Sequence, residues 1–309
     1  MLLMKRYWWV VIGLLLCANV HARLLVITSQ ESVLYSEFQQ GLNLVLSRGQ
    51  HDVVDVRPAQ EIAAVTDLAA YSVIVVAGVE AAKALSERGP VNRPVFYTML
   101  PFSSYEWLEE NKMLARQHKV LYIDQPPQRY VELAQAAMPE VRTIGYLYGD
   151  ASAVFTSEIR KAVDEAGVEF VGVDVSANEK FSDLLKDGFT SSDVILLLPD
   201  PYLYNRRAVQ EVLLASFRYK RPLVVYSESF LKAGAMVALL STPEQIGRQT
   251  GELLGCVGQP CYNAIPQRSY PKYFSVMVNE FVARQLGIDV KSAGELQKYL
   301  ESAENSRPR

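Results

Sequence analysis

The chain has 309 residues, half of which are hydrophobic, and a formal net charge of −3. This length and apolar content are sufficient for two hydrophobic cores, so we expect two lobes. Basic and acidic residues are interspersed and give no basic field, which argues against a nucleic acid as the partner.

The N-terminal residues have the pattern of a secretory signal peptide. A lysine and an arginine precede an apolar run from Tyr7 to Cys17, and Val20-His21-Ala22 supplies small residues where a signal peptidase cleaves. We therefore expect residues 1–22 to be a signal peptide and the mature protein to be periplasmic. Two alternatives stay open. One is a retained N-terminal anchor, and the other is a lipid on Cys17, although Leu16 stands where a lipobox requires a small residue.

From Arg23 onward, short apolar strands alternate with helical patterns. The expected strands of the first half span 24–28, 52–56, 73–77, 94–98 and 120–124, and the expected helices span 34 to about 49, 59–68 and 80–87. Gln125-Pro126-Pro127 follows the fifth strand and is a natural crossing between lobes.

The second half repeats this order of elements. The expected strands span 144–148, 170–173, 194–198, 223–226, 235–240 and 273–278, and the expected helices span 155–166, 179–186, 209–217 and 279–286. Thr242-Pro243-Glu244-Gln245 is a capping box with proline in the first turn, so a further helix is expected to begin there. The polar residues 301–309 are expected to form a disordered tail. Strands that alternate with helices predict parallel sheets, whose ligands gather beyond the carboxyl ends of the strands.

Cys256 and Cys261 are the only cysteines outside the expected signal peptide. In an exported protein, two cysteines five positions apart around Gly258 and Pro260 predict a local disulfide, with two reduced thiols as the alternative. The three histidines are scattered, so we expect no metal site and no cofactor.

The candidate ligand-binding residues follow the expected strands. Those of the first lobe are Ser29, Glu31, Gly78, Glu80 and Thr98, and those of the second are Tyr148, Asp150, Ser152, Asp200, Tyr202, Ser227 and Glu228. Backbone amides at the helix starts can hold a carboxylate, and the acidic side chains suit an ammonium group. The pattern therefore predicts a zwitterion or a polar cation as the ligand.

Several of these residues also have a purely structural interpretation. Ser29 and Ser152 are good helix caps, Asp200 between two prolines is a typical turn former, and Tyr202 can simply pack. Glu228 is the sharpest candidate, because a carboxylate directly after an apolar strand is unusual unless a ligand faces it. The sequence has no Gly-x-Ser-x-Gly elbow, phosphate loop or metal-binding histidine spacing, so we do not expect an enzyme.

A series of short motifs carries a family resemblance. The motifs are Arg221-Pro222 before an apolar strand that ends at Ser227, then Lys232 to Ala235, Ile246-Gly247-Arg248, Asn279 and Leu286-Gly287-Ile288. In these the chain resembles the periplasmic substrate-binding proteins of ABC transporters, specifically the uncharacterised ABC substrate-binding family that includes tryptophan and tyrosine binders. The chain differs from the amino-acid binders at residues 98–101, where Asp-Pro is usual, and at 148–152, where asparagine-rich turns are common.

The resemblance implies an α/β fold of the type I periplasmic-binding-protein kind, with two doubly wound parallel-sheet lobes joined by a hinge of three crossings. The implied N-terminal lobe comprises 23–124 plus 241–266, and the implied C-terminal lobe comprises 125–240 plus 267–300. It further implies a monomer that captures a small amino-acid-like ligand between its lobes and delivers it to an ABC permease in the inner membrane. The alternative is a lobe that senses a ligand or docks on a membrane receptor.

Overall fold

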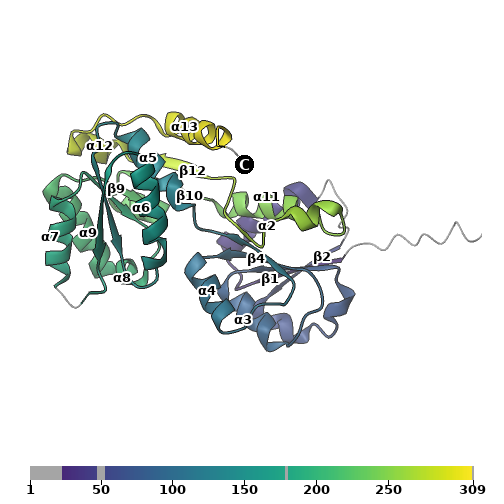
Figure 1. Ribbon diagram of the computed structural model, residues 1–309. Helices are drawn as coiled ribbons and strands as arrows, with labels where there is room; N and C mark the ends of the chain where they lie inside the picture. Colours follow the sequence, from purple (N-terminus) through teal and green to yellow (C-terminus); the bar gives the residue numbers. More distant parts are fainter. Residues whose placement is uncertain (1–22, 47–52, 178–179, 308–309) are drawn as a thin grey trace, which may run out of the picture.

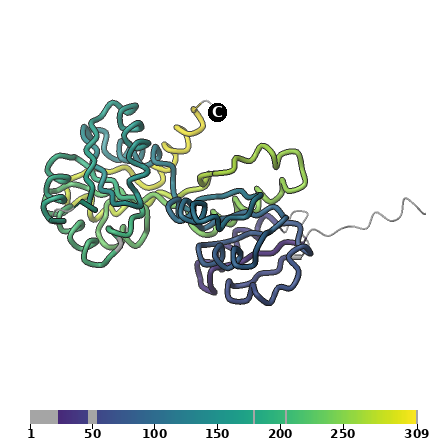
Figure 2. Tube along the Cα trace, turned by 60° about the horizontal axis from the view of Figure 1, so that its bottom comes forward, coloured from purple at the N-terminus to yellow at the C-terminus, as the bar shows by residue number. Residues whose placement is uncertain are grey.

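A computed structural model describes residues 23–46, 53–177 and 180–307 of the chain (Figure 1). The expected signal peptide, residues 1–22, lies outside the described residues. No helix within the described ranges is both long and apolar enough to cross a membrane. The chain forms two bodies joined by a narrow junction (Figures 1 and 2).

Each body contains a six-stranded sheet, and corresponding strands follow the same order in the two sheets. The first has the order β2-β1-β3-β4-β5-β11 and is parallel throughout. The second has the order β7-β6-β8-β9-β10-β12, in which only β12 is antiparallel, against β10. The two-lobed, doubly wound α/β fold expected from the sequence is thereby confirmed. The strands are β1 (Arg23–Thr28), β2 (Val53–Pro58), β3 (Val73–Ala77), β4 (Val95–Leu100), β5 (His118–Tyr122), β6 (Thr143–Tyr148), β7 (Glu169–Asp174), β8 (Val194–Leu197), β9 (Leu223–Val225), β10 (Val237–Leu240), β11 (Arg268–Ser269) and β12 (Ser275–Val278).

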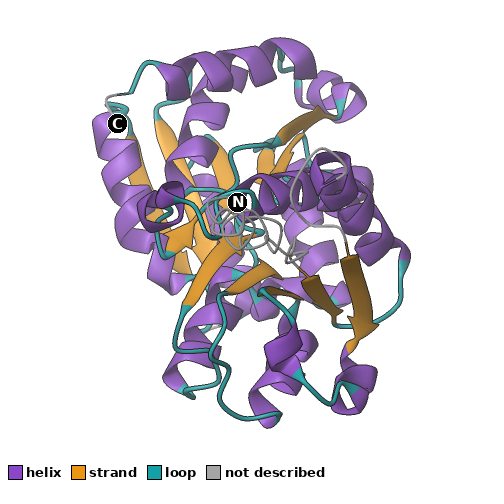
Figure 3. Ribbon diagram, turned by 90° about the vertical axis from the view of Figure 1, so that its right-hand side faces the viewer, coloured by secondary structure: helices purple, strands orange, loops and turns teal. Residues whose placement is uncertain are grey.

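Helices cover both faces of each sheet (Figure 3). Because both faces are covered, the central strands are apolar along their whole length, as in β3, whose five residues are all buried. The helices of the first lobe are α2 (Val33–Leu46), α3 (Val79–Glu87), α4 (Phe102–Glu110) and α11 (Pro243–Leu254). Those of the second are α5 (Pro127–Ala137), α6 (Thr156–Glu165), α7 (Phe181–Thr190), α8 (Pro201–Tyr204), α9 (Arg206–Tyr219), α10 (Glu228–Ala233), α12 (Glu280–Leu286) and α13 (Ala293–Asn305).

Helix α11 returns to the first lobe and packs directly on α2. The expected capping box is present at its start, because the Thr242 side chain accepts from the Gln245 backbone N–H and the Gln245 side chain accepts from the Thr242 N–H. The two helices approach so closely that a Cβ on Gly247 would lie 2.0 Å from the Phe38 carbonyl oxygen. A Cβ on Gly41 would lie 1.9 Å from the Glu244 carbonyl oxygen. Glycine is therefore required on both helices for this contact.

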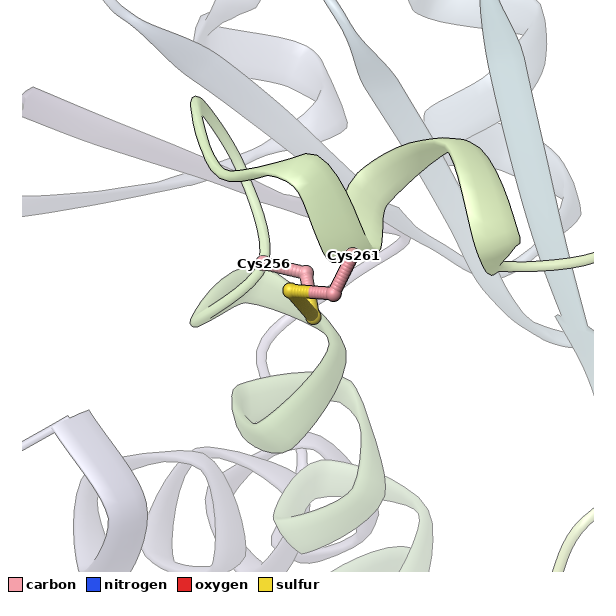
Figure 4. The surroundings of a disulfide bond; sticks show 2 residues. All are labelled: Cys256 and Cys261. Carbon is pink, nitrogen blue, oxygen red and sulfur yellow. A yellow bond between two sulfur atoms is a disulfide. The ribbon is translucent and has the colours of Figure 1, made fainter.

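The expected disulfide joins Cys256 and Cys261 in the turn after α11 (Figure 4). Cys261 belongs to the short 3-10 helix Pro260–Ala264, which leads toward β11. The disulfide thus closes a local turn at the end of the segment that α11 contributes to the first lobe.

Four features differ from the sequence-based expectations. Residues 59–68 form no α-helix; two 3-10 helices, Ala59–Ala64 and Leu68–Ala70, take their place. Helix α5 begins at Pro127, where no helix was expected, since proline is tolerated in the first helical turn. Strand β11 still pairs with β5, so the chain leaves the first sheet after residue 269 and not at 266. Helix α13 continues to Asn305, past the expected start of a disordered tail at residue 301, because a Ser292–Glu295 capping box starts it and Leu296 and Leu300 are buried.

Three segments cross between the lobes, and buried polar side chains tie them together. The Gln125 amide donates to the Ser241 hydroxyl at 2.8 Å, and that hydroxyl donates to the Tyr273 carbonyl oxygen at 2.6 Å. The Arg129 guanidinium donates to the Pro271 carbonyl oxygen at 3.1 Å and to the Glu304 carboxylate at 2.5 Å. Each crossing is therefore hydrogen-bonded to another crossing or to α5.

Candidate functional site

The carboxyl ends of both sheets border the junction between the lobes. Strand β5 leads directly into the first crossing, and β10 leads directly into the second. In each sheet the helices after two adjacent strands, β1 and β3 or β6 and β8, pack on opposite faces. These two positions are topological switch points, where α/β sheets bind ligands.

The switch point of the first lobe brings Ser29, Gly78 and Tyr35 together. Gly78 has a φ of 93° and a ψ of 169°, a conformation essentially restricted to glycine. A Cβ on Gly78 would lie 2.2 Å from the Tyr35 hydroxyl and 2.4 Å from the Ser29 Oγ. The Ser29 Oγ accepts a hydrogen bond of 3.2 Å from the Ala81 N–H. Ser29 therefore caps α3, which follows the neighbouring strand, and does not cap the helix that follows it in sequence.

The other predicted residues of the first lobe lie apart from this cluster. Glu31 and Glu80 are exposed, and the Glu80 carboxylate pairs with the Lys83 ammonium at 2.9 Å. Thr98 is only 1% exposed and lies 3.4 Å from the Thr250 hydroxyl of α11. Thr98 is buried in this arrangement of the lobes, and its contact with a ligand stays a prediction. The register of β4 against β5 is irregular between Thr98 and Leu100, a bulge that locally changes which side chains face the core.

The switch point of the second lobe is organised by the Asp200 carboxylate. Asp200 is fully buried, and its Oδ2 accepts hydrogen bonds from the Gly149 N–H at 3.0 Å and from the Ser152 N–H and hydroxyl at 2.9 and 2.7 Å. Its Oδ1 accepts from the Tyr202 N–H at 2.8 Å. Four donors of its own lobe thus occupy Asp200, and Ser152 is itself 0% exposed. Both residues hold the loops after β6 and β8 together, and their direct contact with a ligand stays a prediction.

Exposed groups surround the buried side chains of Asp200 and Ser152. The Tyr202 hydroxyl donates to the Asp150 carboxylate at 3.3 Å, and Tyr202 is 46% exposed. Tyr148 is half-buried, with its ring centroid 5.4 Å from that of Tyr146. A Cβ on Gly149 would lie 2.6 Å from the Asp200 carboxylate, so only glycine fits beneath it. Asp150 and Tyr202 are therefore the most exposed of the predicted residues in this loop pair.

Ser227 and Glu228 begin α10 at the end of β9. The Ser227 Oγ accepts from the Phe230 N–H at 3.3 Å, so Ser227 is the N-cap of that helix. The Glu228 carboxylate is exposed and pairs with the Lys232 ammonium at 2.7 Å. An ion pair within the helix accounts for Glu228 without a ligand, although its exposure leaves it accessible.

In each lobe one polar side chain joins the two loops of the switch point, but the strand that this side chain follows differs between the lobes. In the first lobe, Ser29 follows β1 and binds the helix after β3. In the second, Asp200 follows β8 and binds the loop after β6. Each side chain fixes the two loops of its switch point relative to each other, which positions the exposed groups around them.

Aromatic rings and a buried carboxyl connect the lobes at the first crossing. The Phe102 ring of α4 lies 5.1 Å from the Phe155 ring of the second lobe and 5.2 Å from the Tyr122 ring, centroid to centroid. The Asp124 carboxylate accepts a hydrogen bond of 2.6 Å from the Phe102 N–H. Burial raises the pKa of Asp124 to about 6, from an ordinary value of 3.8. Sequence analysis missed Tyr35, Phe102 and Asp124, since none of them forms a recognisable local motif.

Large apolar side chains are exposed beside both switch points. Val33 and Leu34 in the first turn of α2 are 75% and 43% exposed, and Val154 before α6 is 49% exposed. Both positions follow the first strand of their sheet. The site can therefore offer apolar walls next to the carboxylates of Glu31 and Asp150. Among the residues that the structure describes, no cluster of histidine, cysteine or acidic side chains could hold a metal ion.

Solved structures share this architecture, and they include a substrate-binding protein. A ligand-free, open substrate-binding protein with adhesive properties from Clostridium difficile has a TM-score of 0.66 at 15% identity, covering 88% of this chain and 96% of that one. An ABC domain from Streptococcus pneumonia in complex with L-Trp has a TM-score of 0.58 at 16% identity, covering 90% and 98%. A conserved domain protein from Vibrio cholerae has a TM-score of 0.56 at 20% identity, covering 90% and 98%. Similarity at these identities establishes the fold.

The sequence itself matches a family model. No curated protein matches the chain. The model for ABC transporter substrate binding proteins matches residues 122–298, which is more than half of the chain and includes the whole of the second sheet. The chain therefore belongs to the ABC transporter substrate-binding protein family.

Proposed function

We propose that this protein is the periplasmic solute-binding component of an ABC-type transport system and that it captures a small, amino-acid-like ligand between its lobes. The observation that carries the proposal is the placement of two topological switch points at the carboxyl edges beside the interlobe crossings. Both switch points are internally braced, by Ser29 and by Asp200. Bracing of this kind supports a preorganised ligand site.

The chemistry beside the switch points suits an amine that carries an apolar group. Asp150 and Glu31 would bind an ammonium group as charge-assisted acceptors. The first N–H groups of α3, beside Gly78, would bind a carboxylate through the partial positive charge of a helix N-terminus. Val33, Leu34 and Tyr202 would contact the apolar part, since all three are exposed.

Binding would be coupled to closure of the lobes about the three crossings. A ligand that contacts both carboxyl edges stabilises the arrangement in which the edges are close, so it shifts the population toward the closed form. The closed form is the state that an ABC permease would recognise.

A thermal-shift screen of residues 23–309 against amino acids, amines, purines and sugars tests the proposal. A ligand at a hundred times its dissociation constant should stabilise the protein by about 2.7 kcal/mol. Asp150→Asn should weaken an amine ligand at least tenfold by calorimetry. Glu165→Gln is the matched control, because Glu165 is an exposed carboxylate at the far end of α6.

Two outcomes would count against the proposal. The first is the absence of any stabilising compound across the library. The second is a ligand whose affinity is unchanged by Asp150→Asn, Gly78→Ala and Tyr202→Ala, which would place the ligand away from both switch points.

A further inference from the structure

An apolar groove lies on the second lobe at the opposite end of its sheet from the candidate ligand site. It has a volume of about 480 Å³ and is lined by α9, by the turn between α10 and β10, and by α12. The turn precedes β10, and α12 follows β12, whose last residue Val278 pairs with the first residue of β10, Val237. The groove is therefore at the amino end of β10, whereas Asp150 and Tyr202 are at the carboxyl ends of β6 and β8.

Large apolar side chains protrude around the groove. Leu214 and Phe217 of α9 are 64% and 68% exposed, and Phe281 of α12 is 64% exposed. These residues line one cavity together with Leu213, Val282 and Leu286. Single exposed apolar residues are common, but a contiguous group of this kind marks an interaction surface. We call these six residues, with the basic residues described next, the α9–α12 surface.

The α9–α12 surface carries uncompensated positive charge. Arg218 and Lys220, at the carboxyl end of α9, form no ion pair with any residue of the described ranges. Arg218 follows Leu214 by one helical turn, so it lies beside the apolar stripe. The Glu280 carboxylate of α12 is already paired with the Arg284 guanidinium at 3.6 Å. An occupant of this surface should therefore be anionic.

We propose that the α9–α12 surface docks on a phospholipid bilayer that contains anionic lipids. Protruding phenylalanine and leucine side chains flanked by arginine and lysine are the composition of interfacial membrane-binding helices. The apolar side chains enter the boundary between headgroups and acyl chains, and the unpaired cations contact lipid phosphates. Because the groove is at the opposite end of the sheet from the switch points, docking leaves the space between the lobes open to ligand. The proposal is independent of which ligand that space binds.

Vesicle flotation of residues 23–309 tests the proposal. The protein should float with phosphatidylglycerol and phosphatidylethanolamine vesicles at low salt, and binding should fall as salt increases. Phosphatidylcholine vesicles should bind it at least tenfold more weakly. Replacing both Arg218 and Lys220 with alanine should reduce the partition coefficient about 30-fold. The reason is that each cation near an anionic membrane contributes favourably to the free energy of binding.

The apolar contribution is tested separately. Phe217→Glu combined with Phe281→Glu should reduce the partition coefficient by more than tenfold, whereas Leu44→Glu should leave it unchanged. Leu44 is the matched control, because it is 54% exposed on α2 of the other lobe. All three positions are solvent-exposed, so circular dichroism should show an unchanged fold.

Three results would overturn the proposal. One is no binding to phosphatidylglycerol vesicles at low salt. Another is equal binding by the wild-type protein and the Phe217 and Phe281 double variant. The third is a concentration-dependent dimer in light scattering that the same double variant abolishes while vesicle binding is unchanged, which would assign the surface to a second copy of the chain.

Discussion

Gly78→Ala should damage the first switch point through two separate effects. The φ of 93° and ψ of 169° belong to a region that costs a residue with a Cβ about 1–3 kcal/mol. The new Cβ would also lie 2.4 Å from the Ser29 Oγ, so Ser29 must move and release the Ala81 N–H. Loss of a helix cap costs about 1 kcal/mol more. We therefore expect the free energy of unfolding to fall by about 2–4 kcal/mol.

The matched control is Gly89→Ala. Gly89 also has a positive φ, of 89°, but a Cβ there would meet no atom within 4 Å. This variant should lose only about 1–2 kcal/mol, the cost of a left-handed conformation. Urea denaturation at pH 7 measures both variants, and calorimetry measures ligand affinity, which only Gly78→Ala should reduce. Equal stability losses and equal affinities in the two variants would refute the close contact of Gly78 with Ser29 and Tyr35.

Three further predictions concern the second switch point, the α2–α11 contact and the hinge. Asp200→Asn should lower the free energy of unfolding by about 3 kcal/mol in urea denaturation, because an amide nitrogen cannot accept from the N–H groups of Gly149 and Ser152. In the control variant, Asp150→Asn, the free energy of unfolding should change little. Gly247→Ala should cost about 3 kcal/mol, since the Cβ would meet the Phe38 carbonyl oxygen at 2.0 Å. Gly294→Ala, in α13 with no atom near the new Cβ, should be neutral or stabilising by up to about 1 kcal/mol. The raised pKa of Asp124, about 6 against an ordinary 3.8, means that the folded protein binds this proton more tightly than the unfolded chain. Its contribution to stability is thus complete below about pH 4 and is lost as the pH rises to about 6, a change of about 3 kcal/mol. Asp124→Asn should remove that part of the pH dependence in thermal melts from pH 4 to 7 and should raise the melting temperature at pH 7; an unchanged pH profile would contradict the burial of this carboxyl.

The strands were predictable from the sequence because parallel sheets bury both faces. Each central strand is then a short apolar run with turn residues at its ends, which is visible without long-range information. The start of α11 was equally clear, since the Thr242 to Gln245 capping box is a local motif. In contrast, α4 buries only Tyr105 and Leu108, so its apolar periodicity is too weak to identify it.

The contacts that organise the site could not be predicted in the same way. The Ser29 hydroxyl binds an amide 52 residues later, and Asp200 binds amides 48 and 51 residues earlier. Both side chains were identified as polar groups at strand ends, but their partners depend on which strands are neighbours in the sheet. Burial of Thr98 likewise depends on α11, which returns from a distant part of the sequence. Strand-end position predicts a candidate site, whereas the hydrogen-bond partners and burial of each of its side chains depend on the tertiary fold.

Small-angle X-ray scattering of residues 23–309 with and without a ligand from the screen tests the central claim most directly. A ligand that binds both carboxyl edges should reduce the radius of gyration at saturation, because the lobes close about the three crossings. Gly78→Ala should require a higher ligand concentration for the same change. A ligand that binds at one-to-one stoichiometry and leaves the scattering curve unchanged would contradict capture between the lobes.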